Sequence, residues 1–376
     1  MRLGINAQLC SPSSSYRNAG ISQYIRHLVT ALGQLSDTPE THLFLPGTNL
    51  DEFPSCFRIH RSGWKSEHPA LRIAWEQFIL PFLARKYHLD ILHSPMHVLP
   101  GICPVQSVVT VLDLAFMRYP GMYPRLQRKY LEFATRRAVR KADAVIAISE
   151  NTRQDLVEAF KIPESRVFTT PLGVDESFAP VPKAKTEEIG RRYGMGERSL
   201  LYVGTLEPRK NITVLLTAFR QVLTALELPC ELVLAGGKGW FYDEVFKLVE
   251  SLDLRNHVRF TGYVPREDLP TLYSAAAVFV YPSLYEGFGL PPLEAMACGT
   301  PVVTSNASSL PEVVGDAGIM VDPQDVDGLA DAILRVLQDS ELRQEMRKNG
   351  LERAKQFTWQ QTARLTLQAY HEALAR

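Results

Sequence analysis

Short apolar runs alternate with segments of helical periodicity along almost the whole chain. Apolar runs flanked by helical patterns are typical of parallel strands that are covered on both faces. The pattern therefore predicts an α/β fold with two doubly wound, Rossmann-like parallel sheets. In the first half we expect strands at 3–8, 42–45, 91–94, 107–112, 144–149 and 167–170 and helices at 21–35, 71–86, 126–141 and 151–160. In the second half we expect strands at 200–204, 231–235, 258–262, 277–281, 301–304 and 319–321, with helices between and after them.

The periodic pattern lapses near residues 171–185, where Pro171, Pro180 and Pro182 cluster. Prolines interrupt helices and central strands, so this segment is predicted to join two domains. We expect an N-terminal domain over 1–172, a C-terminal domain over 173–358, and a last helix over 359–376 that crosses back to the first domain. Ligands of such sheets bind beyond the carboxyl ends of the strands, which predicts a site between the two domains.

The composition narrows the class of protein. A chain of 376 residues with 45% hydrophobic and 22% charged residues is ordinary for two globular domains. Forty-one basic residues balance forty-one acidic ones, which argues against a nucleic-acid partner. The five cysteines are scattered and include no Cys-x-x-Cys pair, so neither a disulfide framework nor a cysteine zinc site is predicted. The absence of a signal-peptide pattern and of a long apolar run favours a cytoplasmic location.

The most informative segment runs from Ser283 to Val302. It places Glu286 and Glu294 on either side of a Gly287-Phe288-Gly289-Leu290 turn, between an expected strand and an expected helix. The start of a helix offers unpaired N–H groups and a partial positive charge, which suit a phosphate. Glycines at such a turn permit backbone angles and close approach that a side chain would block. One glutamate is therefore predicted to meet a sugar and the other a ribose.

A second candidate segment is Gly204-Thr205-Leu-Glu-Pro-Arg209-Lys210-Asn211, which joins an expected strand to an expected helix. Arginine can clamp phosphate oxygens in a bidentate fashion, while lysine acts as a compact charge. Cations at a helix start oppose the helix dipole, so the pair is better explained if an anion lies between them. The alternative is a solvated basic pair.

Two weaker glycine motifs complete the set. Gly236-Gly237-Lys238-Gly239 follows a strand and is interpreted as a tight turn. Asn18-Ala-Gly20, after a serine-rich loop, opens a helix at which a phosphate could approach the backbone.

Together, and in the same order, these motifs resemble glycosyltransferase family 4, retaining enzymes of the GT-B architecture in which two Rossmann-like domains face each other across a cleft. Residues 142–149, 171–175 and 261–265 also look like that family, and the likeness covers about residues 2–356. Within the family the chain looks most similar to mannosyltransferase-like members. The implied reaction moves a hexose, with mannose favoured, from a nucleoside diphosphate sugar to an acceptor hydroxyl with retention at the anomeric carbon. GDP-mannose is the favoured donor and a UDP-hexose the second choice, with a glycan or lipid-linked acceptor in polysaccharide synthesis.

The resemblance also implies roles for individual residues. Arg209 and Lys210 would hold the donor diphosphate, and Glu286 would face the transferred sugar. Glu294 would accept hydrogen bonds from the ribose hydroxyls. The remaining donor-binding positions implied in this way are Gly20, Gly204, Thr205, Tyr263, Val264, Gly287, Phe288, Gly289 and Leu290.

One departure from the family concerns the residue after the strand expected at 107–112. Many members have His-Asp there, whereas this chain has Leu112-Asp113, so Asp113 remains the candidate polar group for the catalytic set. The missing imidazole keeps a non-catalytic nucleotide-sugar binding subunit open as an alternative. A GT-B-like nucleotide-sugar epimerase is a separate alternative. His93 and His97, at a neighbouring strand end, are interpreted as structural.

No metal or other cofactor is predicted. Asp325-Val-Asp327 matches an Asp-x-Asp metal motif, but Asp327 precedes a helical pattern and is interpreted as an N-cap.

A peripheral membrane contact is a further hypothesis. Residues 125–141 contain seven basic residues and one acidic residue in a helical pattern. The helix expected at 71–86 is predicted to expose Trp75 and Phe78 as anchors. A solvated helix face is the alternative.

Overall fold

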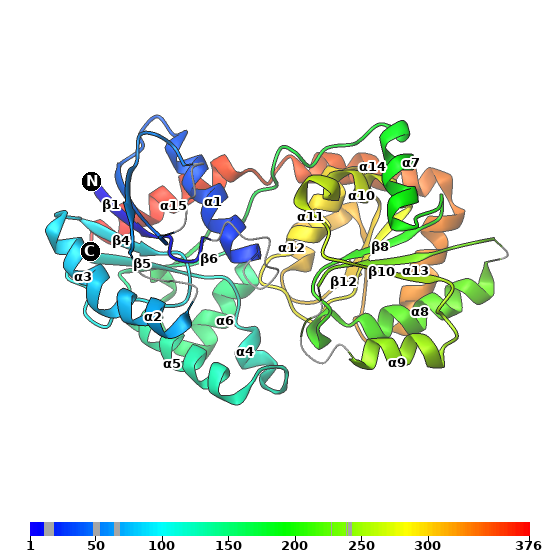
Figure 1. Ribbon diagram of the computed structural model, residues 1–376, viewed down its shortest axis with the longest axis horizontal. Coiled ribbons are helices and arrows are strands. Elements are labelled where there is room, and N and C mark those ends of the chain that lie inside the picture. The colour runs from blue at the N-terminus through cyan, green and yellow to red at the C-terminus, as the bar shows by residue number, and fades with distance from the viewer. Residues whose placement is uncertain (11–18, 48–52, 64–67, 227, 238, 240–242) are drawn as a thin grey trace. The chain divides into compact units, whose positions relative to one another are not determined.

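The computed structural model describes the chain except residues 11–18, 48–52, 64–67, 227, 238 and 240–242. The chain forms two compact units (Figure 1). Unit 1 contains Met1–Gly173 together with Thr358–Arg376, and unit 2 contains Val174–Phe357. The serine-rich loop, Asn18 and Lys238, which belong to the two weaker glycine motifs, lie outside the described residues.

Unit 1 is built on a seven-stranded parallel sheet in the order β3-β2-β1-β4-β5-β6-β7. Its strands are β1 Arg2–Asn6, β2 Glu40–Leu45, β3 Arg58–Arg61, β4 Ile91–Ser94, β5 Gln106–Val111, β6 Ala144–Ala147 and β7 Val167–Thr169. The main helices are α1 Ala19–Gly33, α2 Pro69–Ala74, α3 Leu80–Lys86, α4 Ala115–Arg118, α5 Arg125–Lys141, α6 Glu150–Phe160 and α15 Trp359–Leu374. The edge strand β3 was not predicted, because its four residues Arg-Ile-His-Arg carry no apolar run and are largely exposed.

Alternate residues of β5 show how the two faces of this sheet are covered. Val109 and Val111 belong to a buried cluster with residues of α5 and α6. Thr110 points to the opposite face. Its hydroxyl forms a hydrogen bond of 3.0 Å with the hydroxyl of Tyr24 in α1. Helix α15 lies on that second face, beside α1. Both faces are therefore covered by helices, which accounts for the uninterrupted burial of the central strands.

Helix α15 is fastened to unit 1 by a buried hydrogen-bond chain. The Tyr370 hydroxyl lies 2.7 Å from Nδ1 of His93, and Nε2 of His93 lies 2.8 Å from Oγ1 of Thr110. Burial lowers the pKa of His93 to about 3, so its imidazole is neutral. The hydroxyl of Thr362 donates to the carbonyl of Pro171 at 2.6 Å, near the point where the chain leaves the unit. His93 is thus a structural residue of the sheet–helix contact.

The helix expected at 71–86 is interrupted by a π-helical segment, η2 Trp75–Ile79, between α2 and α3. Pro81 lies two residues after this segment, and a proline inside a helix cannot donate a backbone hydrogen bond and crowds the preceding turn. The amide of Leu80 accordingly bonds to the carbonyl of Trp75. The prediction that Trp75 is exposed is wrong: its side chain is buried against Phe44, whereas Phe78 is exposed as expected.

Unit 2 has a six-stranded parallel sheet in the order β10-β9-β8-β11-β12-β13. Its strands are β8 Leu200–Val203, β9 Leu232–Ala235, β10 Val258–Gly262, β11 Val278–Tyr281, β12 Val302–Ser305 and β13 Ile319–Val321. Its helices are α7 Lys183–Tyr193, α8 Ile212–Ala225, α9 Asp243–Ser251, α10 Leu269–Ala275, α11 Leu290–Ala297, α12 Leu310–Val314, α13 Val326–Gln338 and α14 Ser340–Ala354. Asp325, and not Asp327 as predicted, caps α13 by accepting from the Gly328 amide at 2.8 Å. Asp327 instead accepts from the Gln221 amide side chain.

The strand order of each sheet reverses at one point, between β1 and β4 in unit 1 and between β8 and β11 in unit 2. Loops that leave the carboxyl ends of two such strands diverge to opposite sides and leave a crevice for a ligand. Among the described residues, no helix combines the length and apolar character needed to cross a bilayer.

Candidate active site

The two strongest sequence motifs meet at the switch point of unit 2. The Gly204–Asn211 segment leaves β8 and the Pro282–Gly289 segment leaves β11, and these two strands are hydrogen-bonded neighbours. The amide of Leu284 also donates to the carbonyl of Arg209 at 2.9 Å, so the loops themselves are joined.

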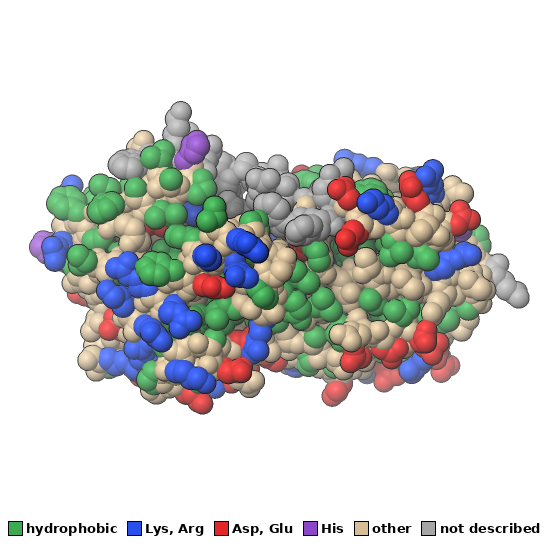
Figure 2. Space-filling view, turned by 90° about the horizontal axis from the view of Figure 1, so that it is seen from below, with side chains coloured by type: hydrophobic (Ala, Val, Ile, Leu, Met, Phe, Trp, Pro, Cys, Tyr) green, Lys and Arg blue, Asp and Glu red, His purple; other side chains and the backbone are tan. Residues whose placement is uncertain are grey.

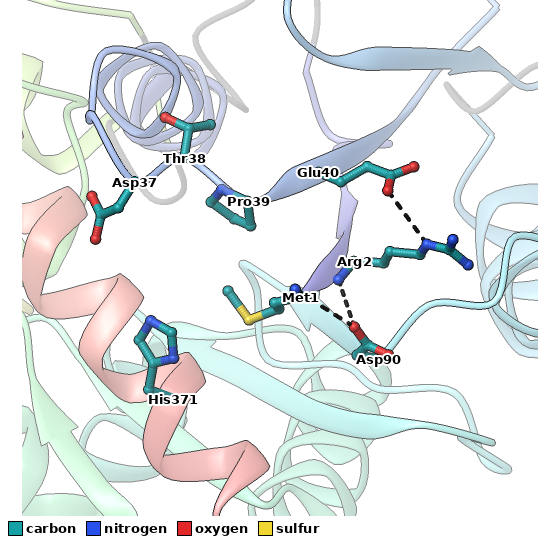
Figure 3. Close-up of a pocket in the computed structure, with 8 residues that line it drawn as sticks. All are labelled: Met1, Arg2, Asp37, Thr38, Pro39, Glu40, Asp90 and His371. Atoms are coloured by element: carbon teal, nitrogen blue, oxygen red, sulfur yellow. Dashed lines mark hydrogen bonds and ion pairs between the residues drawn. The ribbon is translucent and has the colours of Figure 1, made fainter.

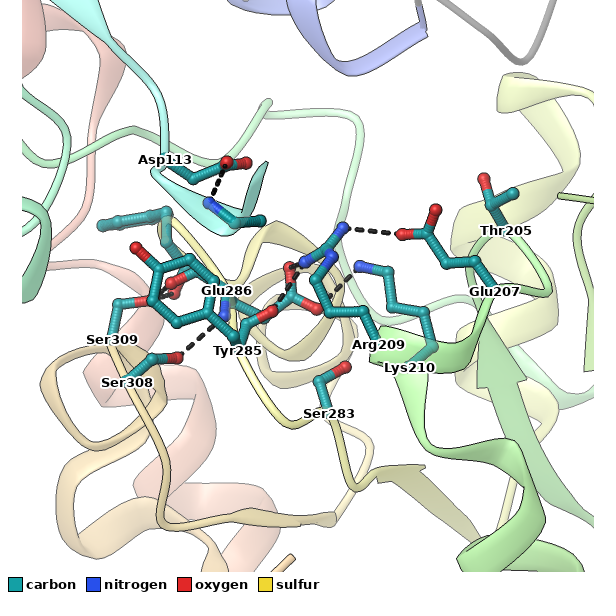
Figure 4. Close-up of polar contacts among 12 residues, drawn as sticks. Asp113, Thr205, Glu207, Arg209, Lys210, Ser283, Tyr285, Glu286, Ser308 and Ser309 are labelled. Carbon is teal, nitrogen blue, oxygen red and sulfur yellow. Dashed lines mark hydrogen bonds and ion pairs between the residues drawn. The ribbon is translucent and has the colours of Figure 1, made fainter. Parts of the chain in front are cut away.

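Glu286 lies between the two cations of the other loop (Figure 4). Its Oε1 is 2.6 Å from Nζ of Lys210, and its Oε2 is 3.0 Å from a guanidinium nitrogen of Arg209. Lys210 also donates to the hydroxyl of Tyr281 at 2.8 Å, and Arg209 also pairs with Glu207 at 2.7 Å. In this structure, the anion between Arg209 and Lys210 is the carboxylate of Glu286.

The charge state of Glu286 is decided by its two cationic neighbours. Burial by itself opposes ionisation of Glu286, but Arg209 and Lys210 outweigh it and lower the pKa of this carboxyl to about 2. Burial and the neighbouring charge of Arg209 lower the pKa of Lys210, which Glu286 partly opposes. Glu286 is therefore ionised at every physiological pH.

The Gly-Phe-Gly turn is held in place by two serines at the start of α12. The Ser308 hydroxyl accepts from the amide of Glu286 at 2.8 Å. The buried Ser309 hydroxyl contacts the carbonyls of Glu286 and Phe288 at 2.9 and 2.7 Å. Gly289 has φ +115°, and a Cβ there would lie 2.8 Å from Leu310, so this position requires glycine.

The helix that follows offers fewer phosphate donors than a helix start usually does. Helix α11 begins Leu290-Pro291-Pro292, and the two prolines have no N–H group. The backbone donors that remain at this end belong to the turn and to Leu290. Most of the positive charge available to an anion at this site therefore comes from Arg209 and Lys210.

Glu294 occupies a separate environment on α11. Its Oε2 accepts from the Tyr273 hydroxyl at 3.0 Å, and Oε1 lies 3.8 Å from the guanidinium of Arg266. Burial raises the pKa of this carboxyl to about 7, although Arg266 and Tyr273 act in the opposite direction. The two glutamates of the motif thus differ: Glu286 is a fixed anion, whereas Glu294 titrates near neutral pH.

The remaining predicted donor-binding residues of unit 2 line the same edge of its sheet. Tyr263, in the loop after β10, is 45% exposed, whereas its neighbour Val264 is buried. Gly204 directly follows β8, and Thr205 comes next and is half-buried. The carbonyl of Thr205 accepts a hydrogen bond from the Tyr202 hydroxyl at 3.3 Å.

The glycine cluster after β9 serves packing, in agreement with its interpretation as a tight turn. A Cβ on Gly236 would lie 2.0 Å from the carbonyl oxygen of Gly204. Leu206 exchanges backbone hydrogen bonds with Gly237 and Gly239, both at 3.0 Å. These bonds hold the loop that carries Arg209 and Lys210.

Two predicted residues belong to unit 1. Gly20 is exposed at the start of α1, with open space where a Cβ would be, so sterics within the described chain do not require glycine there. Asp113 follows β5 and accepts from the amide of Ala115 at 2.9 Å. Burial lowers the pKa of the His97 imidazole, and the Asp113 carboxylate partly opposes that shift.

A hollow of about 610 Å³ in unit 1 lies at the opposite edge of the sheet, where β1 and β2 begin (Figure 3). Arg2 spans part of its rim by pairing with Glu40 at 3.3 Å, and the Arg2 amide donates to Asp90 at 2.7 Å. None of the predicted site residues lines this hollow, and it lies at the amino ends of the strands, where doubly wound sheets do not bind their ligands.

Sequence reasoning missed Glu207, Tyr281, Tyr273 and the two serines as parts of the site. Glu207 could have been suspected, because it stands two positions before Arg209 in the same loop. The others come from different segments, and only the strand order brings them close.

Comparison with known proteins identifies the family of the chain. Residues 19–178 match the family Glycosyltransferase Family 4, and residues 186–353 match Glycosyl transferases group 1. The chain is 36% identical over 368 residues to O-antigen chain mannosyltransferase B of Escherichia coli, covering 94% of this chain and 96% of that protein. It is 34% identical over 278 residues to the serotype-specific mannosyltransferase WbdA of Escherichia coli, covering 73% of this chain and 33% of that protein.

Solved structures show the same architecture. Sucrose-phosphate synthase from Thermosynechococcus elongatus superposes with a TM-score of 0.77 at 25% identity, covering 100% of this chain and 99% of the other. HepE of Anabaena, solved with UDP and glucose, superposes with a TM-score of 0.75 at 18% identity, covering 99% of both chains.

Two doubly wound units of this kind, with a cationic loop at the switch point of the second, define a GT-B glycosyltransferase. The matches extend over both units, and the chain belongs to glycosyltransferase family 4. It is a glycosyl-transferring enzyme that uses a nucleotide sugar and an acceptor.

Proposed function

We propose that the enzyme is a retaining mannosyltransferase that moves mannose from GDP-mannose to a hydroxyl of a growing polysaccharide or of its lipid-linked precursor. The observation that carries the proposal is the buried Arg209–Glu286–Lys210 cluster at the β8/β11 switch point. Mannose is favoured over another hexose because relatives that match most of the chain are mannosyltransferases by name. A UDP-hexose is the second choice of donor.

In the proposed reaction the bond between the anomeric carbon and the leaving phosphate oxygen breaks. Positive charge grows on the sugar and negative charge on the phosphate, which Arg209 and Lys210 stabilise. The acceptor oxygen bonds to the anomeric carbon from the same face, and its proton passes to the leaving phosphate. Glu286, neutralised by two cations within 3.0 Å, is a poor nucleophile and is assigned to orient a sugar hydroxyl.

The other site residues receive roles by position. Glu294 accepts hydrogen bonds from the ribose hydroxyls, and Tyr263 and Val264 contact the base. The backbone of residues 287–290 binds sugar hydroxyls or the distal phosphate. Gly20 and Asp113 contribute from unit 1. No metal is required, because the basic pair supplies the charge compensation; turnover that is lost in a chelator and restored by magnesium or manganese would contradict this.

The test is a thermal-melting panel with nucleoside diphosphates and their sugars, followed by product analysis. A ligand at one hundred times its dissociation constant raises the free energy of unfolding by about 2.7 kcal/mol. GDP and GDP-mannose should stabilise the protein most, and the product should keep the anomeric configuration of the donor. Stabilisation by UDP-sugars alone would mean that the donor is a UDP-hexose and not GDP-mannose. An inverted product would refute the retaining mechanism.

We also propose a peripheral contact with a membrane, because a lipid-linked acceptor is presented at a bilayer surface.

A further inference from the structure

The α2–η2–α3 segment of unit 1 turns an apolar stripe outward. Leu71, Phe78 and Phe82 are 41%, 77% and 63% exposed, and their spacing of seven and four residues places them on one side of a helix. The opposite side, with Trp75 and Leu80, is buried against the sheet. A helix whose two sides are both apolar is expected to have a second apolar contact.

Helix α5 presents a mixed basic and apolar side. Leu126 and Phe133 are 86% and 65% exposed. Lys129, Arg137 and Arg140 are exposed at helical spacing with Phe133. Within the described chain, none of these three cations has a carboxylate partner within ion-pair distance. Long basic side chains beside aromatic rings, without acidic partners, are typical of helices that lie on anionic surfaces.

The two surfaces adjoin each other. The side chain of Gln77 in η2 accepts from the Gly101 amide at 2.8 Å, and a Cβ on Gly101 would lie 2.4 Å from the guanidinium of Arg137. Ile102, next in the chain, is 74% exposed between them. We call the surface formed by Leu71, Phe78, Phe82, Ile102, Leu126, Lys129, Phe133, Arg137 and Arg140 the basic–apolar face.

The basic–apolar face concentrates the exposed apolar side chains of the described residues. Six of the nine large hydrophobic residues that are exposed in that part of the chain belong to it. Figure 2 shows apolar and basic side chains interspersed over the half of the molecule that holds unit 1. Exposed apolar groups scattered among unpaired cations match the interface of a bilayer with anionic lipids better than a hydrophobic protein groove, because both parts of the surface find a partner there.

We infer that the basic–apolar face docks unit 1 on an anionic lipid bilayer. The inference rests on the proposed function in one respect, namely that docking would deliver a lipid-linked acceptor. Helices α3 and α5 lead into the amino ends of β4 and β6, so their own amino ends lie toward the carboxyl edge of the sheet. Leu71 and Leu126 are therefore at the edge where doubly wound sheets bind their ligands.

The test is co-sedimentation of the full chain with phosphatidylcholine vesicles, with and without phosphatidylglycerol, at low and high salt. The wild-type protein should bind only the anionic vesicles and should dissociate at high salt. Replacing Lys129, Arg137 and Arg140 together by alanine should weaken binding about 100-fold. The pair Phe78→Ser and Phe82→Ser should weaken binding to the anionic vesicles even at low salt.

The matched control replaces Lys185, Arg191 and Lys247, three exposed basic residues of unit 2, by alanine. The control makes the same change in net charge and should bind like the wild type. Equal losses in the control and in the α5 triple variant would overturn the inference, because net charge alone would then explain binding. A dimer that forms without vesicles and is abolished by Phe78→Ser and Phe82→Ser would also overturn it, since a second copy would cover the face.

Docking and catalysis are separated by a transfer assay with a lipid-free acceptor. The docking variants should keep wild-type turnover in that assay, because none of the changed residues belongs to the site. Wild-type protein that binds vesicles but transfers no sugar would defeat the proposed function and leave the docking face intact.

Discussion

Replacing Glu286 by glutamine tests whether this carboxylate holds the place of the donor phosphate. Glutamine keeps the shape of the side chain but removes the charge that Arg209 and Lys210 share. Lys210 is only 7% exposed, and it would keep the hydroxyl of Tyr281 as a partner but would have no counter-charge within bonding distance. The pKa of the Glu286 carboxyl is lowered from 4.5 to about 2, which corresponds to about 3 kcal/mol of stabilisation of its ionised form in the folded protein. Breaking a buried ion pair from one side costs about 3–5 kcal/mol in other proteins, which is of the same order.

We therefore expect the free energy of unfolding of Glu286→Gln to fall by about 3 kcal/mol at pH 7, measured by urea denaturation. The pH dependence provides an internal check. Because the folded-state pKa lies below the unfolded one, the stabilisation is present above pH 4.5 and is lost as the pH falls toward 2. The difference between wild type and variant should shrink over that same range.

Donor binding should respond in the opposite direction. In the variant, Arg209 and Lys210 no longer have to break an ion pair with Glu286 before they bind the diphosphate. The affinity of the enzyme for the donor, measured by calorimetry, should therefore be kept or increased. Turnover should fall about 10- to 100-fold, because a charge-assisted hydrogen bond to the sugar is lost. Equal losses of turnover and donor affinity, or an unchanged stability, would refute the reasoning.

The other predictions concern neighbouring residues. Lys210→Met should lower kcat about 10²- to 10³-fold in a transfer assay, because one preorganised donor to the leaving phosphate is removed; a loss confined to KM would contradict this. Glu294, whose pKa is raised to about 7, keeps its proton in the folded state over pH 4.5–7, so wild-type stability should fall by about 3 kcal/mol as the pH rises through that window. Urea unfolding at pH 5 and pH 8 should show this fall in the wild type and not in Glu294→Gln. Ser309→Ala removes the single hydroxyl that contacts the buried carbonyls of Glu286 and Phe288 and should cost about 1–3 kcal/mol of stability. Thr224→Ala, which removes an exposed hydroxyl on α8, is the control that should change little.

Periodicity was sufficient to predict the two parallel sheets, because strands buried on both faces and helices between them leave a strong pattern. It failed at β3, an edge strand whose exposure removes that pattern. It also could not separate Trp75 from Phe78: both fit a helix, and only the π-helical segment before Pro81 and the neighbouring Phe44 determine which one faces inward.

The contacts within the candidate site could not be predicted, for a related reason. The residue types of each motif indicated phosphate and sugar binding, but no single motif indicates what its members contact. That Glu286 pairs with Arg209 and Lys210 depends on β11 lying beside β8, although the two strands are separated by two others in the sequence. Strand order is a property of the whole sheet, so contacts that depend on it are absent from local patterns.

The return of α15 to unit 1 has a consequence for biosynthesis. Unit 2 is one continuous stretch of chain, whereas unit 1 is interrupted and needs Thr358–Arg376 to be complete. During translation, therefore, the later-encoded unit can finish folding first, while the part of the unit 1 sheet that α15 covers, including His93, stays exposed until Tyr370 leaves the ribosome. The period in which the nascent protein is most exposed to aggregation is set by the helix that is made last among these elements.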